Sequence, residues 1–132
     1  MKFTVPGEPR GKQRPRFSRR TGTTYTPSET VAYEKEVRAE FLRAGGRKTD
    51  GPVALNITAY YKIPTSATKA EREKMLAGQL PQKKPDIDNV LKIIMDGLNG
   101  AAYKDDKQVA AAAASKAYDD EPHVEVEVSW TD

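Results

Sequence analysis

Two short acidic motifs carry the residues of this chain that are best suited to chemistry. Asp86 and Asp88 stand where a polar loop passes into a predicted helix, and Lys92 follows one turn after Asp88. A second pair, Asp105-Asp106, comes just before a predicted strand. Carboxylate oxygens are the ligands that Mg²⁺ takes, and a bound Mg²⁺ beside a lysine can support phosphodiester hydrolysis. The two motifs could together supply three carboxylates and one lysine to a metal-dependent site.

The same residues also have a purely structural interpretation. Asp86 can cap the helix, Asp88 can complement its dipole, and Lys92 can pair with Asp88 for about 0.3–0.5 kcal/mol. The pair Asp105-Asp106 alone is typical of a turn, and Asp96 is expected to be solvated or bonded to a neighbouring loop. Spacing alone favours this structural interpretation over a metal site.

The composition excludes several other classes of site. The 132 residues include no cysteine and one histidine, His123, which excludes thiolate nucleophiles, disulfides and His-rich metal sites and argues against a Ser-His-Asp triad. No apolar run approaches the roughly 20 residues of a membrane span, and the first residues lack the apolar stretch of a signal peptide. We therefore expect a cytoplasmic protein without membrane contact, with His123 exposed on the polar face of the last strand.

The net charge of +3 hides an asymmetry along the chain. Residues 1–50 carry 12 Lys/Arg against 6 Asp/Glu, a balance of +6, and residues 51–132 carry 10 against 13, a balance of −3. The basic excess lies in a segment at about 7–25, which its prolines and glycines predict to be an exposed loop. Its cations are Arg10, Lys12, Arg14, Arg16, Arg19 and Arg20.

Arginine outnumbers lysine in this segment, which suits bidentate contact with phosphate oxygens. Nucleic acid is therefore the leading partner, and a loop that merely keeps the protein soluble is the alternative. Phe17 and Tyr25 flank the arginines and could either stack on bases or anchor the loop.

The hydropathy pattern predicts one α+β domain over residues 1–132. Strands are predicted at 2–5, 53–61 and 124–130, and helices at 26–44, 68–78 and 86–98. The alanines of 110–114 favour a helix by propensity, although Val109 and Tyr118 around them allow a strand. A mixed sheet of about four strands packed with two main helices is the simplest assembly.

Local signals predict where these helices begin and end. Thr26 and Glu29 can form a capping box with Pro27 at the first helical position, and Gly45-Gly46 can stop that helix. Thr68 and Glu71 open the second helix.

Several segments form a pattern that spans most of the chain. They are Lys84-Pro85-Asp86-Ile87-Asp88-Asn89-Val90-Leu91-Lys92, Asp96-Gly97-Leu98-Asn99-Gly100, Tyr103-Lys104-Asp105-Asp106-Lys107-Gln108-Val109, Gly11-Lys12-Gln13-Arg14-Pro15-Arg16-Phe17 and Tyr25-Thr26-Pro27. In this order they resemble the RusA family of Holliday junction resolvases. The fold of that family implies that the alanine run is a strand.

The resemblance implies specific roles. Asp86, Asp88, Lys92 and Asp106 fall on the catalytic positions, the three aspartates would hold Mg²⁺ or Mn²⁺, and Asp105 would support Asp106. It implies a homodimer that nicks two opposed strands of a four-way DNA junction, in a family often encoded by phages and prophages. The expected DNA contacts are Lys12, Arg14, Arg16, Arg19, Arg20, Lys83 and Lys84.

Two other functions stay open at this point. One is a less selective nuclease for flaps and branched DNA, which would share the chemistry without the junction preference. The other is a non-catalytic DNA-binding protein whose acidic motif is only the start of a helix.

Overall fold

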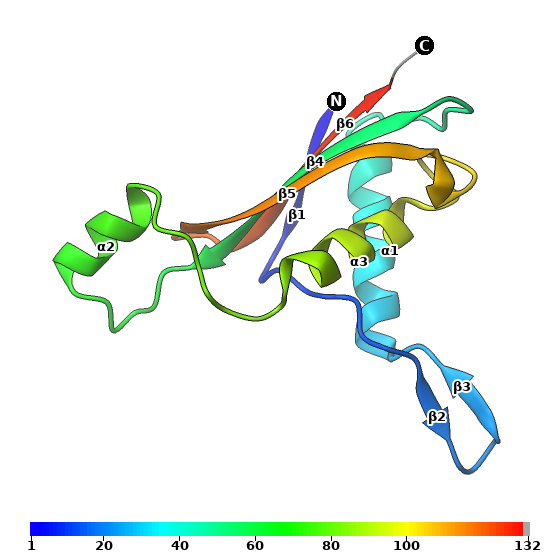
Figure 1. The fold of residues 1–132 in the computed structure, drawn as a ribbon, viewed down its shortest axis with the longest axis horizontal. Coiled ribbons are helices and arrows are strands. Elements are labelled where there is room, and N and C mark those ends of the chain that lie inside the picture. Colours follow the sequence, from blue (N-terminus) through cyan, green and yellow to red (C-terminus); the bar gives the residue numbers. More distant parts are fainter. Residues whose placement is uncertain (131–132) are drawn as a thin grey trace.

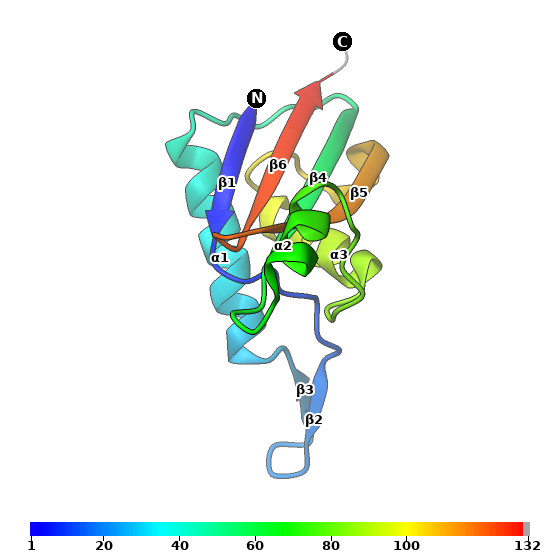
Figure 2. The same ribbon diagram turned by 90° about the vertical axis from the view of Figure 1, so that its left-hand side faces the viewer.

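A mixed four-stranded sheet in the order β1-β6-β4-β5 forms the centre of the fold (Figure 2). The structure is a computed structural model, and it describes residues 1–130. The strands are β1 (Lys2–Pro6), β4 (Val53–Lys62), β5 (Val109–Asp119) and β6 (His123–Trp130). β6 runs antiparallel to both of its neighbours, whereas β4 and β5 are parallel, so a crossover must connect them.

Helices α1 (Ser28–Arg43) and α3 (Ile87–Leu98) lie against one face of the sheet (Figure 1). The apolar positions of these helices and the inward-facing residues of β1, β4 and β6 form one buried core. α3 belongs to the β4–β5 crossover. The crossover also contains α2 (Lys69–Leu76), which has no buried residue and lies at one end of the sheet. The predicted α+β domain with a four-stranded mixed sheet is confirmed, with two packing helices and a third short one.

The alanine run forms strand β5 rather than a helix. Its residues from Ala111 to Ala114 pair in register with Ala54 to Ile57 of β4. Five alanines have a helical propensity, but the run is too short to form a stable helix by itself. The parallel ladder to β4 decides its conformation.

The basic segment contains a hairpin that its sequence did not predict. β2 (Arg16–Ser18) pairs with β3 (Thr23–Tyr25), and the hairpin extends away from the body of the molecule (Figures 1 and 2). Gly22 has φ +70°, a conformation that glycine adopts readily, and its N–H donates to the carbonyl of Ser18 at 2.8 Å. The predicted exposed loop is therefore partly ordered as a two-stranded ribbon.

Two local predictions are wrong. α1 begins one residue after Pro27, which is its N-cap, and no side chain caps it, so the predicted capping box of Thr26 and Glu29 is absent. His123 is not simply exposed, because its ring stacks on Tyr60 at 4.4 Å and its Nδ1 lies 2.6 Å from the carbonyl of Glu121.

Other local predictions hold. α2 opens at Thr68 and Glu71 as predicted, and the structure shows that these two residues form a capping box. Gly45-Gly46 follows the end of α1. Across residues 1–130, every helix is too short or too polar to cross a bilayer.

Candidate active site

Asp86 and Asp88 lie at the start of α3, and both side chains are exposed. The backbone carbonyl of Asp86 accepts from the N–H groups of Asn89 and Val90, each at 3.1 Å, but its carboxylate makes no capping hydrogen bond. The Asp88 carboxylate accepts from the N–H of Asn89 at 3.0 Å. Asp86 thus occupies the N-cap position without using its carboxylate there, which leaves that group available to a ligand.

The segment before α3 is fixed to the sheet by two side chains. The hydroxyl of Tyr61 donates to the carbonyl of Pro85 at 2.9 Å. The Nζ of Lys116 donates to the carbonyl of Lys83 at 2.6 Å and lies 5.4 Å from the centre of the Tyr61 ring. Burial, with smaller contributions from the charges of Glu8 and Asp86, raises the pKa of Tyr61 to about 12. These contacts position Asp86 relative to the sheet.

The second acidic pair lies at a short 3₁₀ turn, η1 (Asp106–Gln108). Asp105 accepts from the N–H of Lys107 at 2.9 Å, and this hydrogen bond lowers the pKa of its carboxyl group. Gln108 donates to the carbonyl of Thr49 at 2.9 Å and so fastens the turn to the rest of the fold. The Asp105 carboxylate therefore holds the turn that presents Asp106, which agrees with the supporting role expected of Asp105.

Lys92 brings the two motifs together. Its Nζ lies 3.2 Å from Oδ1 of Asp96 and 3.6 Å from Oδ2 of Asp106. The hydrogen bond to Asp96 raises the pKa of Lys92, so the side chain stays protonated at neutral pH. The surface pair between Asp88 and Lys92 considered above is not formed. Asp96 also pairs with the loop residue Lys12, as its expected bonding to a neighbouring loop suggested.

The donor chemistry fits a divalent cation, although the acids are not gathered around one point. Nowhere in residues 1–130 do three Asp, Glu or His side chains lie close enough to hold one ion jointly. Mg²⁺ is commonly held by one or two carboxylates together with waters and substrate phosphates, so a complete cage in the free protein is not required. The roles of Asp86, Asp88 and Asp106 as metal ligands remain predictions.

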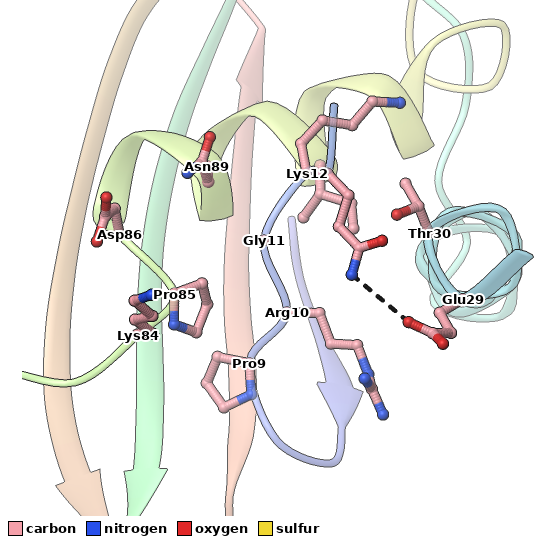
Figure 3. Close-up of a pocket in the computed structure, with 12 residues that line it drawn as sticks. Pro9, Arg10, Gly11, Lys12, Glu29, Thr30, Lys84, Pro85, Asp86 and Asn89 are labelled. Carbon is pink, nitrogen blue, oxygen red and sulfur yellow. Dashed lines mark hydrogen bonds between the residues drawn. The ribbon is translucent and has the colours of Figure 1, made fainter. Parts of the chain in front are cut away.

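A cleft of about 430 Å³ opens beside Asp86. The segment that includes Gly11 runs between the start of α3 and α1, with Arg10 and Lys84 on the walls (Figure 3). The two cations give an acidic site a positively charged approach, which suits a polyanionic substrate.

Comparison with known proteins identifies the family of this chain. Residues 6–129 match the family described as "Endodeoxyribonuclease RusA". The chain belongs to the RusA endodeoxyribonuclease family. It is also 38% identical over 135 residues to "Uncharacterized protein YqaN" of Bacillus subtilis (strain 168), with 96% of this chain and 93% of YqaN covered. The name of that relative states no activity.

The cations predicted to bind DNA in this RusA-family chain fall into three groups. Arg14, Arg16, Arg19 and Arg20 are exposed on the hairpin and the segment leading into it. Phe17 and Tyr25, on the same hairpin, are 63% and 49% exposed. Lys83 and Lys84 are exposed just before Asp86.

Lys12 forms a group of its own, because its side chain is directed into the protein. Its Nζ lies 3.1 Å from Oε2 of Glu34 and 3.1 Å from Oδ2 of Asp96. Burial by itself would lower the pKa of Lys12, but the hydrogen bonds to Asp96 and Glu34 outweigh it and raise the pKa. Of the seven predicted DNA contacts, Lys12 is thus the one held in a partly buried ion-pair cluster.

Sequence reasoning missed four residues that shape the site. Tyr61 and Lys116 hold the segment before Asp86, Gln108 holds the turn of Asp106, and Glu34 pairs with Lys12. No local pattern points to these contacts, since each joins elements that are distant in the sequence.

Proposed function

We propose that this RusA-family protein is a structure-specific endonuclease that resolves four-way DNA junctions by Mg²⁺-dependent phosphodiester hydrolysis. The observation that supports it best is the position of Lys92 beside Asp106. This contact joins the second acidic motif to α3, the helix that carries the first motif. A site of this composition is suited to phosphoryl chemistry.

In this proposal Asp86, Asp88 and Asp106 hold the cation. When bound, Mg²⁺ would polarise the phosphoryl oxygen, activate water and stabilise the leaving oxygen. Lys92 stays protonated, because its bond to Asp96 raises its pKa, and it therefore acts as a positive charge rather than as a base. Its ammonium stabilises the negative charge that grows on the phosphoryl group in the transition state.

The exposed arginines of the hairpin bind the DNA backbone away from the scissile bond. Guanidinium groups make bidentate contacts with phosphate oxygens, and such contacts orient a protein on DNA without reading its sequence. Lys83 and Lys84, exposed just before Asp86, would bind the phosphates beside the acidic site. The arrangement favours recognition of DNA shape over recognition of base sequence.

A homodimer completes the proposal. Paired symmetric nicks in a four-way junction require two active sites related by a two-fold axis, and a closed two-fold dimer is the commonest way to provide them. Sedimentation analysis of the purified protein would detect such a dimer.

The direct test compares three radiolabelled substrates that share strand sequences: a four-way junction, a flap and a linear duplex. With Mg²⁺ the protein should nick the junction in two opposed strands, should cut the flap much more slowly and should leave the duplex intact. Equal cutting of flap and junction would favour the less selective nuclease instead. Junction binding without any cutting in Mg²⁺ or Mn²⁺ would favour the non-catalytic DNA-binding protein.

A further inference from the structure

We infer that Lys12 is a positioning residue of the active site, acting on Lys92 through Asp96, and that it does not bind DNA. The inference rests on the proposed nuclease function, because it concerns the geometry of the lysine assigned to the transition state. It reassigns a residue that composition places among the DNA contacts.

The backbone delivers Lys12 to α3. The N–H of Lys12 donates to the carbonyl of Asn89 at 2.8 Å. The preceding residue, Gly11, comes so close to α3 that a Cβ added there would lie 2.7 Å from Cβ of Pro85 and 3.0 Å from Cβ of Asn89. Only a residue without a side chain fits this approach. The close docking fixes where the Lys12 side chain begins (Figure 3).

From that point the Lys12 side chain reaches two acids on different helices. Glu34 belongs to α1 and Asp96 to α3, and Nζ of Lys12 lies 3.1 Å from an oxygen of each. The side chains of Lys12, Glu34 and Asp96 are only 22%, 16% and 19% exposed. Charges shielded from water to this degree interact more strongly than surface pairs. A phosphate contact by Lys12 would require breaking both pairs.

Asp96 connects Lys12 to Lys92. Its Oδ2 faces Lys12 at 3.1 Å and its Oδ1 faces Lys92 at 3.2 Å, so each carboxylate oxygen is held by a different lysine. The Lys92 ammonium is then shared between Asp96 and Asp106, the latter at 3.6 Å. The orientation of Asp96 therefore sets where Lys92 stands relative to the second acidic motif.

Removing the Lys12 charge should change the position of Lys92. Asp96 would lose one of its two cations, its carboxylate could turn, and both of its oxygens could take up Lys92. Lys92 would then be drawn toward Asp96 and away from Asp106. The rate of the chemical step should fall, while the surface that binds DNA stays unchanged.

The test measures cleavage and binding separately for the full-length protein. Single-turnover nicking of a four-way junction at saturating protein, and junction affinity at several salt concentrations, are compared for wild type, Lys12→Gln and Lys12→Arg. Lys35→Gln, an exposed residue next to Glu34 on α1, removes the same charge without touching the cluster. Arg16→Gln shows the behaviour of a proposed phosphate contact.

Lys12→Gln should lower the single-turnover rate by about 10- to 100-fold, keep the affinity within about twofold and leave its salt dependence unchanged. Lys12→Arg should recover part of the rate, and Lys35→Gln should match wild type. A Lys12→Gln variant with an unchanged rate but weaker, less salt-dependent binding, as expected of Arg16→Gln, would overturn the inference.

If Lys12→Gln folds poorly, Asp96→Asn alone tests the inference: its single-turnover rate should fall about 10- to 100-fold at unchanged junction affinity, and an unchanged rate would overturn the inference. If both single variants fold, they can be combined. Because Lys12 acts through Asp96, the double variant should be no slower than the slower of the two single variants, whereas fully additive losses would contradict the inference. Wild type that cuts no DNA at all would instead overturn the proposed function. Wild type and Lys12→Gln that cut equally well would overturn the role of Lys12 alone.

Discussion

Lys92 lies between two aspartates from different motifs, 3.2 Å from Oδ1 of Asp96 and 3.6 Å from Oδ2 of Asp106. Asp96 is on α3, as Lys92 is, while Asp106 is on the turn before β5. The contact joins two segments that are separate in the sequence through one shared positive charge.

Replacing Lys92 should abolish cutting without abolishing binding. Lys92→Ala removes the charge that stabilises the transition state, and the loss of one such group typically costs about 10²- to 10³-fold in rate. Single-turnover nicking and junction affinity should be measured together. Lys107→Ala is the matched control, because Lys107 lies on the same 3₁₀ turn as Asp106 and pairs with neither Asp96 nor Asp106. A Lys92→Ala variant that cuts within a fewfold of wild type would remove Lys92 from the catalytic group.

The hairpin should account for much of the salt dependence of DNA binding. Each phosphate contact contributes about −0.9 to the slope of log affinity against log salt concentration, so Arg19→Ala/Arg20→Ala should flatten the slope by about 1 to 2 and weaken binding. Lys69→Ala/Lys74→Ala removes the same charge from α2, at the other end of the molecule from the hairpin (Figure 1). If both double variants change the slope equally, the net charge and not the hairpin governs binding.

Gly97 should be required for the close packing of α3 on α1. A Cβ at this position would lie 2.9 Å from Cβ of Val37 and 3.1 Å from the carbonyl oxygen of Glu34. Gly→Ala inside a helix normally raises the unfolding free energy by up to about 1 kcal/mol, but the clash at this position should lower it by about 1–3 kcal/mol. Urea denaturation of Gly97→Ala should therefore show a net loss of unfolding free energy. A gain would mean that the two helices do not approach each other this closely.

Buried tyrosines should make the fold sensitive to alkali. Burial raises the pKa of Tyr61 to about 12 and also raises the pKa of Tyr33 and Tyr103. In the unfolded chain a tyrosine ionises near its ordinary pKa of about 10, so the unfolded state releases these protons first. The contribution of the protonated, buried tyrosines to the unfolding free energy is therefore fully present below about pH 10. It is lost as the pH rises toward 12.

Tyr61→Phe separates this effect from other alkaline effects. At pH 8 the variant should be less stable by about 0.5–1.5 kcal/mol, because the hydrogen bond to the Pro85 carbonyl is lost. Between pH 10 and pH 12 its stability should fall less steeply than that of wild type, while the exposed Tyr25→Phe should follow wild type. Denaturant titrations at each pH measure both. Parallel curves for wild type and Tyr61→Phe would contradict the assignment.

Hydropathy predicted the elements that have a regular pattern. The alternation along Val53–Lys62 and the helical spacing of Val90, Ile94 and Leu98 each correspond to a buried face. The conformation of the alanine run could not be settled in this way, because it depends on pairing with β4 and not on a local preference. The β2–β3 hairpin was missed because its strands are three residues long, polar and without a buried face.

The candidate site was only partly predictable for the same reason. Sequence order placed Asp86 and Asp88 at the start of a helix and Asp106 before a strand, and the structure has them there. It could not show that Lys92 turns to Asp96 and Asp106, or that Lys12 points inward to Glu34. Ion pairs between distant segments depend on the tertiary fold, and a basic stretch looks the same whether its lysine faces DNA or protein.

The most direct test of the account is the nicking of a four-way junction by Asp88→Asn beside wild type, across a range of Mg²⁺ concentrations. Asp88→Asn keeps the size of the side chain and removes one charge of the proposed metal site. The account predicts that the variant binds the junction at least as tightly as wild type, because a charge that repels phosphate is lost, and that it makes almost no nicks. A variant that nicks at the wild-type rate would contradict the central claim that these carboxylates carry the cation on which cutting depends.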